Sequence, residues 1–293
     1  MEKQLIRFDW AIKNILRDKA NFGILEGSLS ELLKEDITII EILESESNRD
    51  TEDNKLNRVD ILAKDEEESY IIFEIQVTKE LDYLSRILFG VSKVISERLL
   101  KGLDYKNVNK VYSVNIVYFD LGHGQDYVYK GNTNFYGLHK HDKLALNEQQ
   151  KKIYSFEKVE EIFPEYYILK VEQFDDETKD TLDEWIYFLK NEQIKSGSIA
   201  KGLNEAKQKL DVLHMDENDK RKYDRYLDEL HYESSMVTSS YGIGKIEGKI
   251  EGREERGTEI AKEMLSDGES IDKIIKYTKL SREEIEKLKK IVN

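Results

Sequence analysis

Residues 58–77, RVDILAKDEEESYIIFEIQV, constrain the fold more than any other segment of this sequence. Two short apolar runs flank a charged cluster, which is typical of two strands joined by a tight turn. Each run carries one carboxylate, Asp60 in the first and Glu74 in the second. If the hairpin is centred near Glu67, Asp60 lies opposite Glu74, with the two Cβ atoms about 5 Å apart. Side chains alternate between the faces of a strand, so Glu74 and Gln76 share one face.

Two carboxylates this close repel each other unless water or a positive charge compensates them. One interpretation places both acids on the solvent-facing side of an antiparallel sheet. A second gives them a shared proton, and a third gives them a bound divalent cation. A shifted strand register would separate them altogether. The segment alone leaves these interpretations open.

The composition narrows the chemistry that such a site can carry. The 293 residues include no cysteine, which excludes disulfides, thiolate zinc sites and cysteine nucleophiles. Of the five histidines, only His139 and His141 form a close pair in the sequence, and no third ligand accompanies them. A bound metal would therefore be a hard cation held by carboxylates.

The charge distribution limits the partners. The net charge of −14 argues against a protein that coats nucleic acid, since binding phosphates requires local positive potential. Residues 241–293 carry 12 Lys or Arg and 12 Asp or Glu, so the excess negative charge lies in residues 1–240. No run approaches the ~20 apolar residues of a membrane span, and MEKQLIRFDW contains no signal-peptide core. We therefore expect a cytoplasmic protein without a membrane partner.

The order of predicted elements indicates an α/β fold, a mixed sheet flanked by helices. Helices are expected over residues 6–17, 22–34, 81–100, 178–190, 196–213 and 217–236, and strands over 37–43, 58–64, 70–77, 110–119, 127–136 and 166–171. No strand signal follows residue 191. We divide the chain into an α/β domain at 1–195, a helical extension at 196–240 and a C-terminal helical region at 241–293.

The C-terminal region begins with the only internal repeat, YGIGKIEGKIEGREERG, in which Gly244, Gly248 and Gly252 are four residues apart. Each glycine inside a helix costs ~1 kcal/mol relative to alanine. The segment is therefore either a flexible linker or a helix that packs closely along its glycine stripe. We favour a helix used in self-association, which gives a homodimer or a higher even-numbered oligomer. Further on, Ser281 and Glu284 form a predicted capping box in a helical hairpin.

Several motifs, taken in order, resemble those of one nuclease family. Asp60, followed on the next strand by FEIQ with Glu74 and Gln76, is similar to the PD-(D/E)XK pattern. Further matching segments are DWAIKNIL near the N-terminus, SRILFGVSKVISERLLKGLDY before the apolar strand VYSVNIVYF, and the tail YTKLSREEIEKL. The chain thus resembles the Rpn-type recombination-promoting nucleases, also described as PD-(D/E)XK nuclease family transposases, over nearly its whole length. The resemblance implies a restriction-endonuclease-like fold.

The resemblance also implies a DNA endonuclease that depends on Mg²⁺ (or Mn²⁺). Asp60 and Glu74 would ligate the metal ion, and with Gln76 they would be the catalytic residues. Gln76 stands where the general PD-(D/E)XK pattern has a lysine. A glutamine can orient a water molecule by hydrogen bonding, but it cannot supply positive charge.

Other basic residues are expected to supply that charge and to contact DNA. Lys13, Lys79 and Lys93 are the candidates for the missing cation. Arg86 and Lys93 lie seven residues apart on the expected helix 81–100, so they share a face that can approach phosphates. Lys13, Arg86 and Lys93 are therefore the predicted DNA contacts.

Three functions compete at this point. The first is the metal-dependent DNA endonuclease, which would promote recombination or act in conflicts with phages and mobile elements. The second is a catalytically weak or inactive protein of the same fold that binds DNA or a partner and acts as an oligomeric regulator. Gln76 and the net charge of −14 leave room for this alternative. The third is an oligomeric scaffold built on the helical tail, with a purely structural α/β domain.

Overall fold

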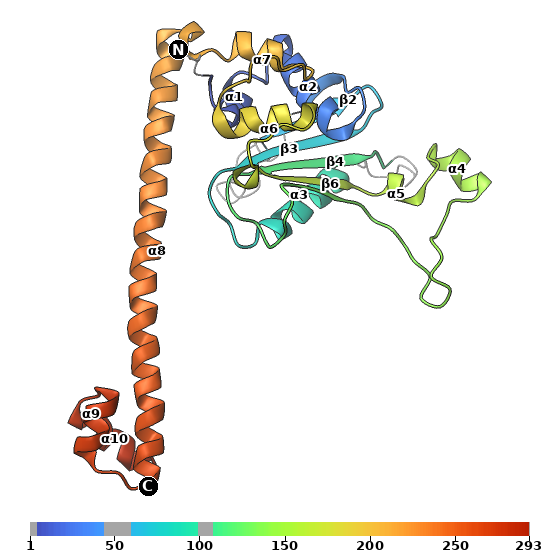
Figure 1. Cartoon of the computed structure of the whole chain (residues 1–293). Coiled ribbons are helices and arrows are strands. Elements are labelled where there is room, and N and C mark those ends of the chain that lie inside the picture. The colour runs from blue at the N-terminus through green and yellow to red at the C-terminus, as the bar shows by residue number, and fades with distance from the viewer. Residues whose placement is uncertain (1–4, 44–59, 99–107, 293) are drawn as a thin grey trace. The chain divides into compact units, whose positions relative to one another are not determined.

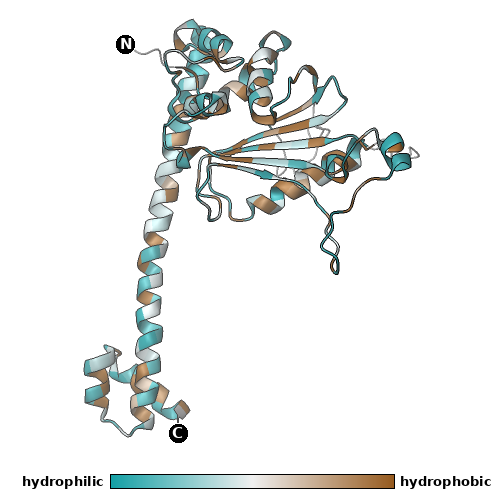
Figure 2. Cartoon of the chain, turned by 45° about the vertical axis from the view of Figure 1, so that its right-hand side comes forward, coloured by the Kyte–Doolittle hydropathy of each residue, from teal (hydrophilic) through white to brown (hydrophobic). Residues whose placement is uncertain are grey.

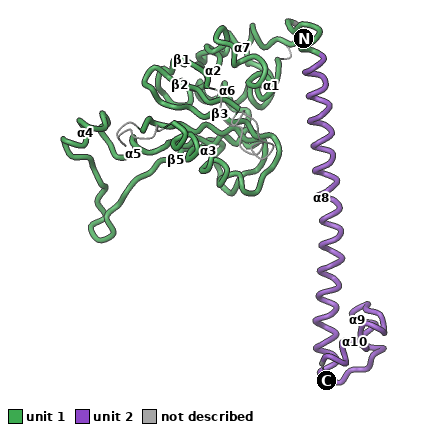
Figure 3. The backbone as a smooth tube through the Cα atoms, turned by 180° about the vertical axis from the view of Figure 1, so that it is seen from behind, with its two compact units in different colours: residues 1–220 green, residues 221–293 purple. Residues whose placement is uncertain are grey.

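The computed structural model describes residues 5–43, 60–98 and 108–292 (Figure 1). The chain divides into two compact units, residues 1–220 and 221–293, and each is described by itself (Figure 3). The first two residues of the strand expected at 58–64 and the LLKGLDY part of the family-like motif, residues 99–105, lie outside the described residues.

The described part of the first unit forms one six-stranded sheet in the order β1-β2-β3-β4-β6-β5. The central strands β3, β4 and β6 are parallel, whereas β1, β2 and β5 pair antiparallel with their neighbours. The mixed sheet expected from the sequence is thereby confirmed. The strands are β1 (Ile39–Leu43), β2 (Ile61–Asp65), β3 (Tyr70–Gln76), β4 (Val111–Val117), β5 (Val128–Gly131) and β6 (Glu165–Lys170).

The hairpin of β2 and β3 has the register expected from the sequence, with Ile61 paired to Phe73. The strand β3 (YIIFEIQ) is rich in β-branched and aromatic residues, which pack well on a pleated surface, and β2 (ILAKD) adds the buried apolar residues Ile61, Leu62 and Ala63. Asp65 holds the turn, because its Oδ1 accepts a hydrogen bond of 2.7 Å from the Ser69 amide. This register brings Asp60, the residue before β2, to the position opposite Glu74.

Helices cover both faces of the sheet, as Figure 1 shows. On one face lie α1 (Phe8–Asn14), α2 (Phe22–Leu33), α6 (Thr181–Asn191) and α7 (Leu203–Lys209), and on the other lies α3 (Tyr83–Arg98). The shorter helices are η1 (Lys19–Asn21), α4 (Glu148–Tyr154), α5 (Val159–Ile162), η5 (Val171–Gln173) and η6 (Val212–His214). A mixed sheet with helices on both faces is the arrangement expected for the restriction-endonuclease-like fold, and that fold class is confirmed.

A separate core lies on each face of the sheet. The first is aromatic: the ring centroid of Phe8 lies 6.1 Å from that of Phe73 and 5.9 Å from that of Trp185. On the other face, Ile72 of β3 packs against Val91 of α3. Because side chains alternate along β3, residue 74 points to the same face as Ile72, and α3 therefore covers Glu74.

Two elements expected in the first unit differ from the structure. The helix predicted at 196–213 is reduced to α7, because Gly197 and Gly202 have φ values of 88° and 82°, which end a right-handed helix. The strand predicted at 127–136 ends at Gly131, where its pairing with β6 ends. The structure also contains α4 and α5, for which no residue range was predicted.

The second unit consists of three helices, α8 (Glu217–Ser266, which begins in the first unit), α9 (Ile271–Thr278) and α10 (Arg282–Val292). Ala261 of α8 packs with Ile274 and Ile285 of the hairpin. The capping box is confirmed, since the Ser281 amide donates to Glu284 Oε2 at 2.7 Å and the Glu284 amide donates to Ser281 Oγ at 3.3 Å. No described helix has both the length and the apolar content needed to cross a membrane.

The helix α8 runs without a break through the glycine repeat. The helical interpretation of residues 242–265 is therefore confirmed, whereas the expected end at residue 236 is wrong. The division at residues 195 and 240 stays a prediction, and the helix crosses residue 240 without interruption.

Candidate active site

Asp60 and Glu74 come together at the open end of the β2–β3 hairpin. The Ile75 amide donates a hydrogen bond of 2.8 Å to Asp60 Oδ2, so the aspartate side chain reaches the main chain beside Glu74. The side chain of Asp60 is 12% exposed and that of Glu74 is 7% exposed. The interpretation that both acids face solvent is therefore wrong, because both side chains are largely buried.

Burial changes the ionisation of both acids. It raises the pKa of Glu74 to about 7, an effect that the neighbouring carboxylates Asp60 and Glu80 increase and the Arg86 guanidinium opposes. Burial also raises the pKa of Asp60, while Lys13 and the Ile75 amide counteract the shift. With a pKa of about 7, Glu74 changes its protonation state near neutral pH.

Two cations from different helices compensate the acids. Arg86 of α3 places its NH2 group 2.6 Å from Glu74 Oε1. Lys13 of α1 places its Nζ 3.5 Å from Asp60 Oδ1, and half of the lysine side chain remains exposed. Each carboxylate of the pair thus has its own positively charged neighbour.

Gln76 lies next to this pair and is held by a further carboxylate. Its Nε2 donates to Glu80 Oε1 at 2.9 Å and to the Thr78 carbonyl at 3.0 Å. Glu80 also accepts hydrogen bonds of 2.8 and 3.0 Å from Arg86 NH1. Glu80 therefore ties the glutamine at the third motif position to the arginine that contacts Glu74.

The predicted cations have separate positions. Of the three lysines proposed as substitutes for the missing charge, Lys13 reaches the acids in the described structure. Lys93 lies 3.7 Å from Glu97 on its own helix, and Lys79 is exposed. The assignment of Lys13, Arg86 and Lys93 as DNA contacts stays a prediction, although the Arg86 guanidinium is engaged by carboxylates.

Some contributors to the site could not be identified from the sequence. Arg17 donates a hydrogen bond of 2.6 Å from NH2 to the Asp60 carbonyl, a contact that depends on how α1 ends against the sheet. Tyr83 is fully buried below the site, and its hydroxyl has no hydrogen-bond partner among the described residues. For Glu80, the only sequence signal is its position four residues after Gln76.

The residues at this site fit a divalent cation. Glu74 Oε1 is buried and accepts no hydrogen bond from the described residues, although Arg86 lies beside it. Within the same residues, no three His, Asp or Glu side chains gather as a ligand set, and this holds for the exposed His139 and His141. An ion would therefore be held by two carboxylates, completed by a main-chain carbonyl near Ile75 and by water, which are oxygen ligands that suit Mg²⁺.

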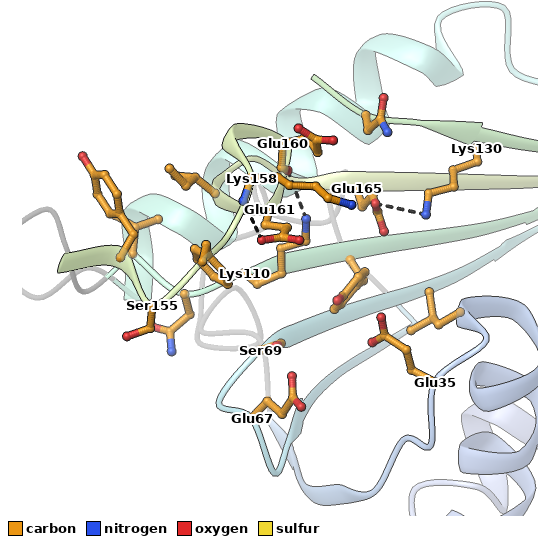
Figure 4. A pocket seen from close by; sticks show the side chains of 18 of the residues that line it. Glu35, Glu67, Ser69, Lys110, Lys130, Ser155, Lys158, Glu160, Glu161 and Glu165 are labelled. Carbon is orange, nitrogen blue, oxygen red and sulfur yellow. Dashed lines mark hydrogen bonds and ion pairs between the residues drawn. The ribbon is translucent and has the colours of Figure 1, made fainter. Parts of the chain in front are cut away.

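A large cavity lies at the other end of the sheet. Its volume is about 750 Å³, and its walls include Tyr112, the second residue of β4, and Glu165, the first residue of β6. Figure 4 shows Lys110 and Lys130 in this cavity, where Lys130 Nζ lies 3.1 Å from Glu165 Oε1. Lys110 donates a hydrogen bond of 2.9 Å to the Phe163 carbonyl. The cavity and the carboxylate pair are thus separate features.

The family assignment can now be tested by comparison. The model of the PD-(D/E)XK nuclease family transposases matches residues 6–240, a range that contains the whole sheet and both acids. No curated protein and no solved structure matches the chain. The fold and the family match agree, and the chain belongs to the PD-(D/E)XK nuclease family transposases.

Proposed function

We propose that the chain is a metal-dependent DNA endonuclease that hydrolyses phosphodiester bonds at the Asp60–Glu74 pair. The observation that carries the proposal is the burial of two opposed carboxylates in a member of a nuclease family. A protein that used this hairpin only for structure would gain little from such a pair, because burying two like charges is costly. A bound cation would offset the repulsion between the two buried carboxylates, and it would give them a role as metal ligands.

Each nearby side chain has a distinct role in the proposed reaction. Asp60 and Glu74 hold the ion, Mg²⁺ or Mn²⁺, which would lower the pKa of a coordinated water and stabilise charge on the phosphate. The Ile75 amide fixes the rotamer of Asp60. Gln76 orients a water molecule, and the half-exposed Lys13 faces the phosphate and supplies the positive charge that Gln76 lacks.

A second function is favoured by one specific observation. Arg86 already contacts Glu74 at 2.6 Å, so the site is partly neutralised by the protein's own cation. Such a site suits a catalytically weak or inactive protein that binds DNA or a partner and acts as an oligomeric regulator. Metal binding without cleavage of DNA would favour this second function.

The partners follow from the same proposal. The substrate is DNA in the cytoplasm, and the biological setting is recombination or conflict with phages and mobile elements. We also propose that the chain self-associates through its C-terminal helical region, as a homodimer or a higher even-numbered oligomer. Two associated nuclease domains can each address one strand of a duplex.

The endonuclease proposal is tested on supercoiled plasmid. The purified chain should nick or cut the plasmid with Mg²⁺ or Mn²⁺ and fail to do so in EDTA. Asp60→Ala and Glu74→Ala should each lower the rate at least about 100-fold, the loss expected for nearly 3 kcal/mol of transition-state stabilisation. Glu66→Ala, which removes an exposed acid from the same hairpin, is the matched control. Undiminished cutting by folded Asp60→Ala would contradict the assignment.

A further inference from the structure

The helix α8 carries apolar side chains that are exposed and find no partner in the described part of the chain. Every residue from 243 to 256 is exposed, including Ile243 (57%), Ile246 (62%) and Ile250 (51%). Figure 2 shows hydrophobic residues recurring along this otherwise hydrophilic helix. Three isoleucines on an isolated helix surface are unusual enough to indicate an interface.

These side chains follow the spacing of a coiled coil. Positions 232, 236, 239, 243, 246 and 250 alternate steps of four and three residues, as the a and d positions of heptads do. We call the six residues the isoleucine seam: Tyr232, Met236, Ser239, Ile243, Ile246 and Ile250. At 3.6 residues per turn, Gly244, Gly248 and Gly252 lie roughly 165° around the helix from the three isoleucines. The glycine stripe and the seam are therefore on opposite faces.

The seam continues into a part of α8 that does have a partner. Four and seven residues beyond Arg253, positions 257 and 260 keep the heptad spacing, and Gly257 and the nearby Ala261 are buried. A Cβ atom added at Gly257 would lie 3.2 Å from the Thr278 carbonyl. The hairpin of α9 and α10 therefore packs directly on the helix face that continues the isoleucine seam. The same helical face is thus covered at its C-terminal end and uncovered from residue 232 to residue 250.

The charges beside the seam select the partner and its direction. With Ile243 and Ile250 at a positions, Lys249 is at g and Glu254 at e. In a parallel pair, the g residue of one helix faces the e residue of the next heptad in the other, which sets Lys249 against Glu254. An antiparallel pair would oppose g with g and e with e, and would bring lysine near arginine and glutamate near glutamate.

We propose that α8 forms a parallel, in-register, two-stranded coiled coil with a second copy of this chain through the isoleucine seam, while the glycine stripe faces away. Isoleucine at the a positions is common in two-stranded coiled coils, whereas Ile246 at a d position is a feature of trimers and tetramers, so the subunit count in the first experiment decides the number of strands. The proposal rests on the self-association put forward above and identifies the face and the direction. It is independent of catalysis, since none of the seam residues lies in the first unit, residues 1–220, which holds the Asp60–Glu74 pair.

The first experiment compares subunit counts by light scattering on the full chain. Wild type should be a dimer, and Ile243→Asp with Ile250→Asp should be monomeric with a folded nuclease unit. Lys249→Glu should raise the dimer Kd about tenfold. The double variant that adds Glu254→Lys should return the Kd to the wild-type value, because the swapped charges attract each other again. If the isoleucine double variant is still a dimer, the chain self-associates through another face and the seam is wrong. If the wild type is a monomer, the proposed self-association is itself wrong.

The second experiment tests direction, and it exploits the absence of cysteine. Ser239→Cys and Ile250→Cys, made separately, should each form an intermolecular disulfide on mild oxidation, because each residue faces its own copy in a parallel, in-register pair. Lys245→Cys, on the far side of the helix, should stay reduced. Failure of either seam cysteine to cross-link in a dimeric protein would overturn the parallel register.

Discussion

Arg86 NH2 lies 2.6 Å from Glu74 Oε1, and this contact places a cation of the protein itself beside the buried acid of the site. The guanidinium is fixed from two more directions: Glu80 accepts hydrogen bonds from its NH1 group, and the Tyr83 ring lies 5.9 Å from its Cζ. The protein thus supplies a cation of its own to Glu74, as Lys13 does to Asp60. A divalent ion would share or take over that task.

Replacing Arg86 with alanine tests how far its charge stabilises the buried acids. In EDTA, Arg86→Ala should lower the free energy of unfolding by about 3 kcal/mol, the low end for breaking a buried pair, because Arg86 is partly exposed. Mn²⁺ should then raise the melting temperature more in the variant than in wild type, since the uncompensated acids bind a cation more tightly. Differential scanning fluorimetry with and without Mn²⁺ measures both effects.

Lys93→Ala is the matched control for this prediction. Lys93 lies on the same helix and contacts Glu97 in an i, i+4 pair, which is worth only about 0.3–0.5 kcal/mol. Its response to Mn²⁺ should equal that of wild type. Equal responses from Arg86→Ala and wild type would mean that the ion does not bind beside Glu74.

The pKa of Glu74 gives a prediction with a definite sign. Its folded-state pKa of about 7 exceeds the ordinary value of 4.5, so between these pH values the folded chain holds a proton that the unfolded chain has released. The stabilising contribution is complete below pH 4.5 and is lost as the pH rises through 7. In EDTA, Glu74→Gln should therefore flatten the fall in stability across this window. Urea unfolding at pH 5, 6, 7 and 8 measures the difference, and parallel curves for the two proteins would contradict the assignment.

The part of the site that follows from local sequence could be predicted. The position of Glu74 opposite Asp60 follows from strand alternation and the turn, both of which are written in twenty consecutive residues. The burial of the pair could not be predicted in this way, because it depends on α3 folding back over β3. Contacts such as Arg17 with the Asp60 carbonyl join segments 43 residues apart, and no spacing rule specifies them.

Gln76 should affect turnover more than metal binding. The residue shares a face with Glu74, and its amide is held by Glu80, so its place is fixed relative to the acids. Gln76→Ala should lower kcat roughly tenfold, about 1.4 kcal/mol, while the Mn²⁺ affinity from calorimetry falls less. Gln76→Lys should raise activity, because it adds the positive charge that Lys13 otherwise supplies from a distance. A Gln76→Ala turnover equal to wild type would reduce Gln76 to a structural residue of the sheet.

The helix at the glycine repeat was predicted from the sequence, and the face through which it packs stays a prediction. The spacing of Gly244, Gly248 and Gly252 indicated a close-packed stripe, yet nothing in the described part of the chain lies within 4 Å of a Cβ atom added at any of them. Ile243, Ile246 and Ile250 lie on the opposite face of the helix. The glycines are the most regular feature of the repeat, but burial of the larger isoleucine side chains contributes more to the free energy of association.

The glycine stripe itself can be tested by filling it. The triple variant Gly244→Ala, Gly248→Ala and Gly252→Ala should fold without strain, because the added methyl groups meet open space and none of the three glycines needs a positive φ. Each substitution favours the helix by ~1 kcal/mol, so the ellipticity at 222 nm and the thermal midpoint of the C-terminal unit should both rise. Light scattering should give the same subunit count as wild type, because the glycines face away from the isoleucine seam. If the triple variant instead dissociates, the methyl groups have entered an interface, the two helices meet along the glycine stripe, and the seam assignment is wrong.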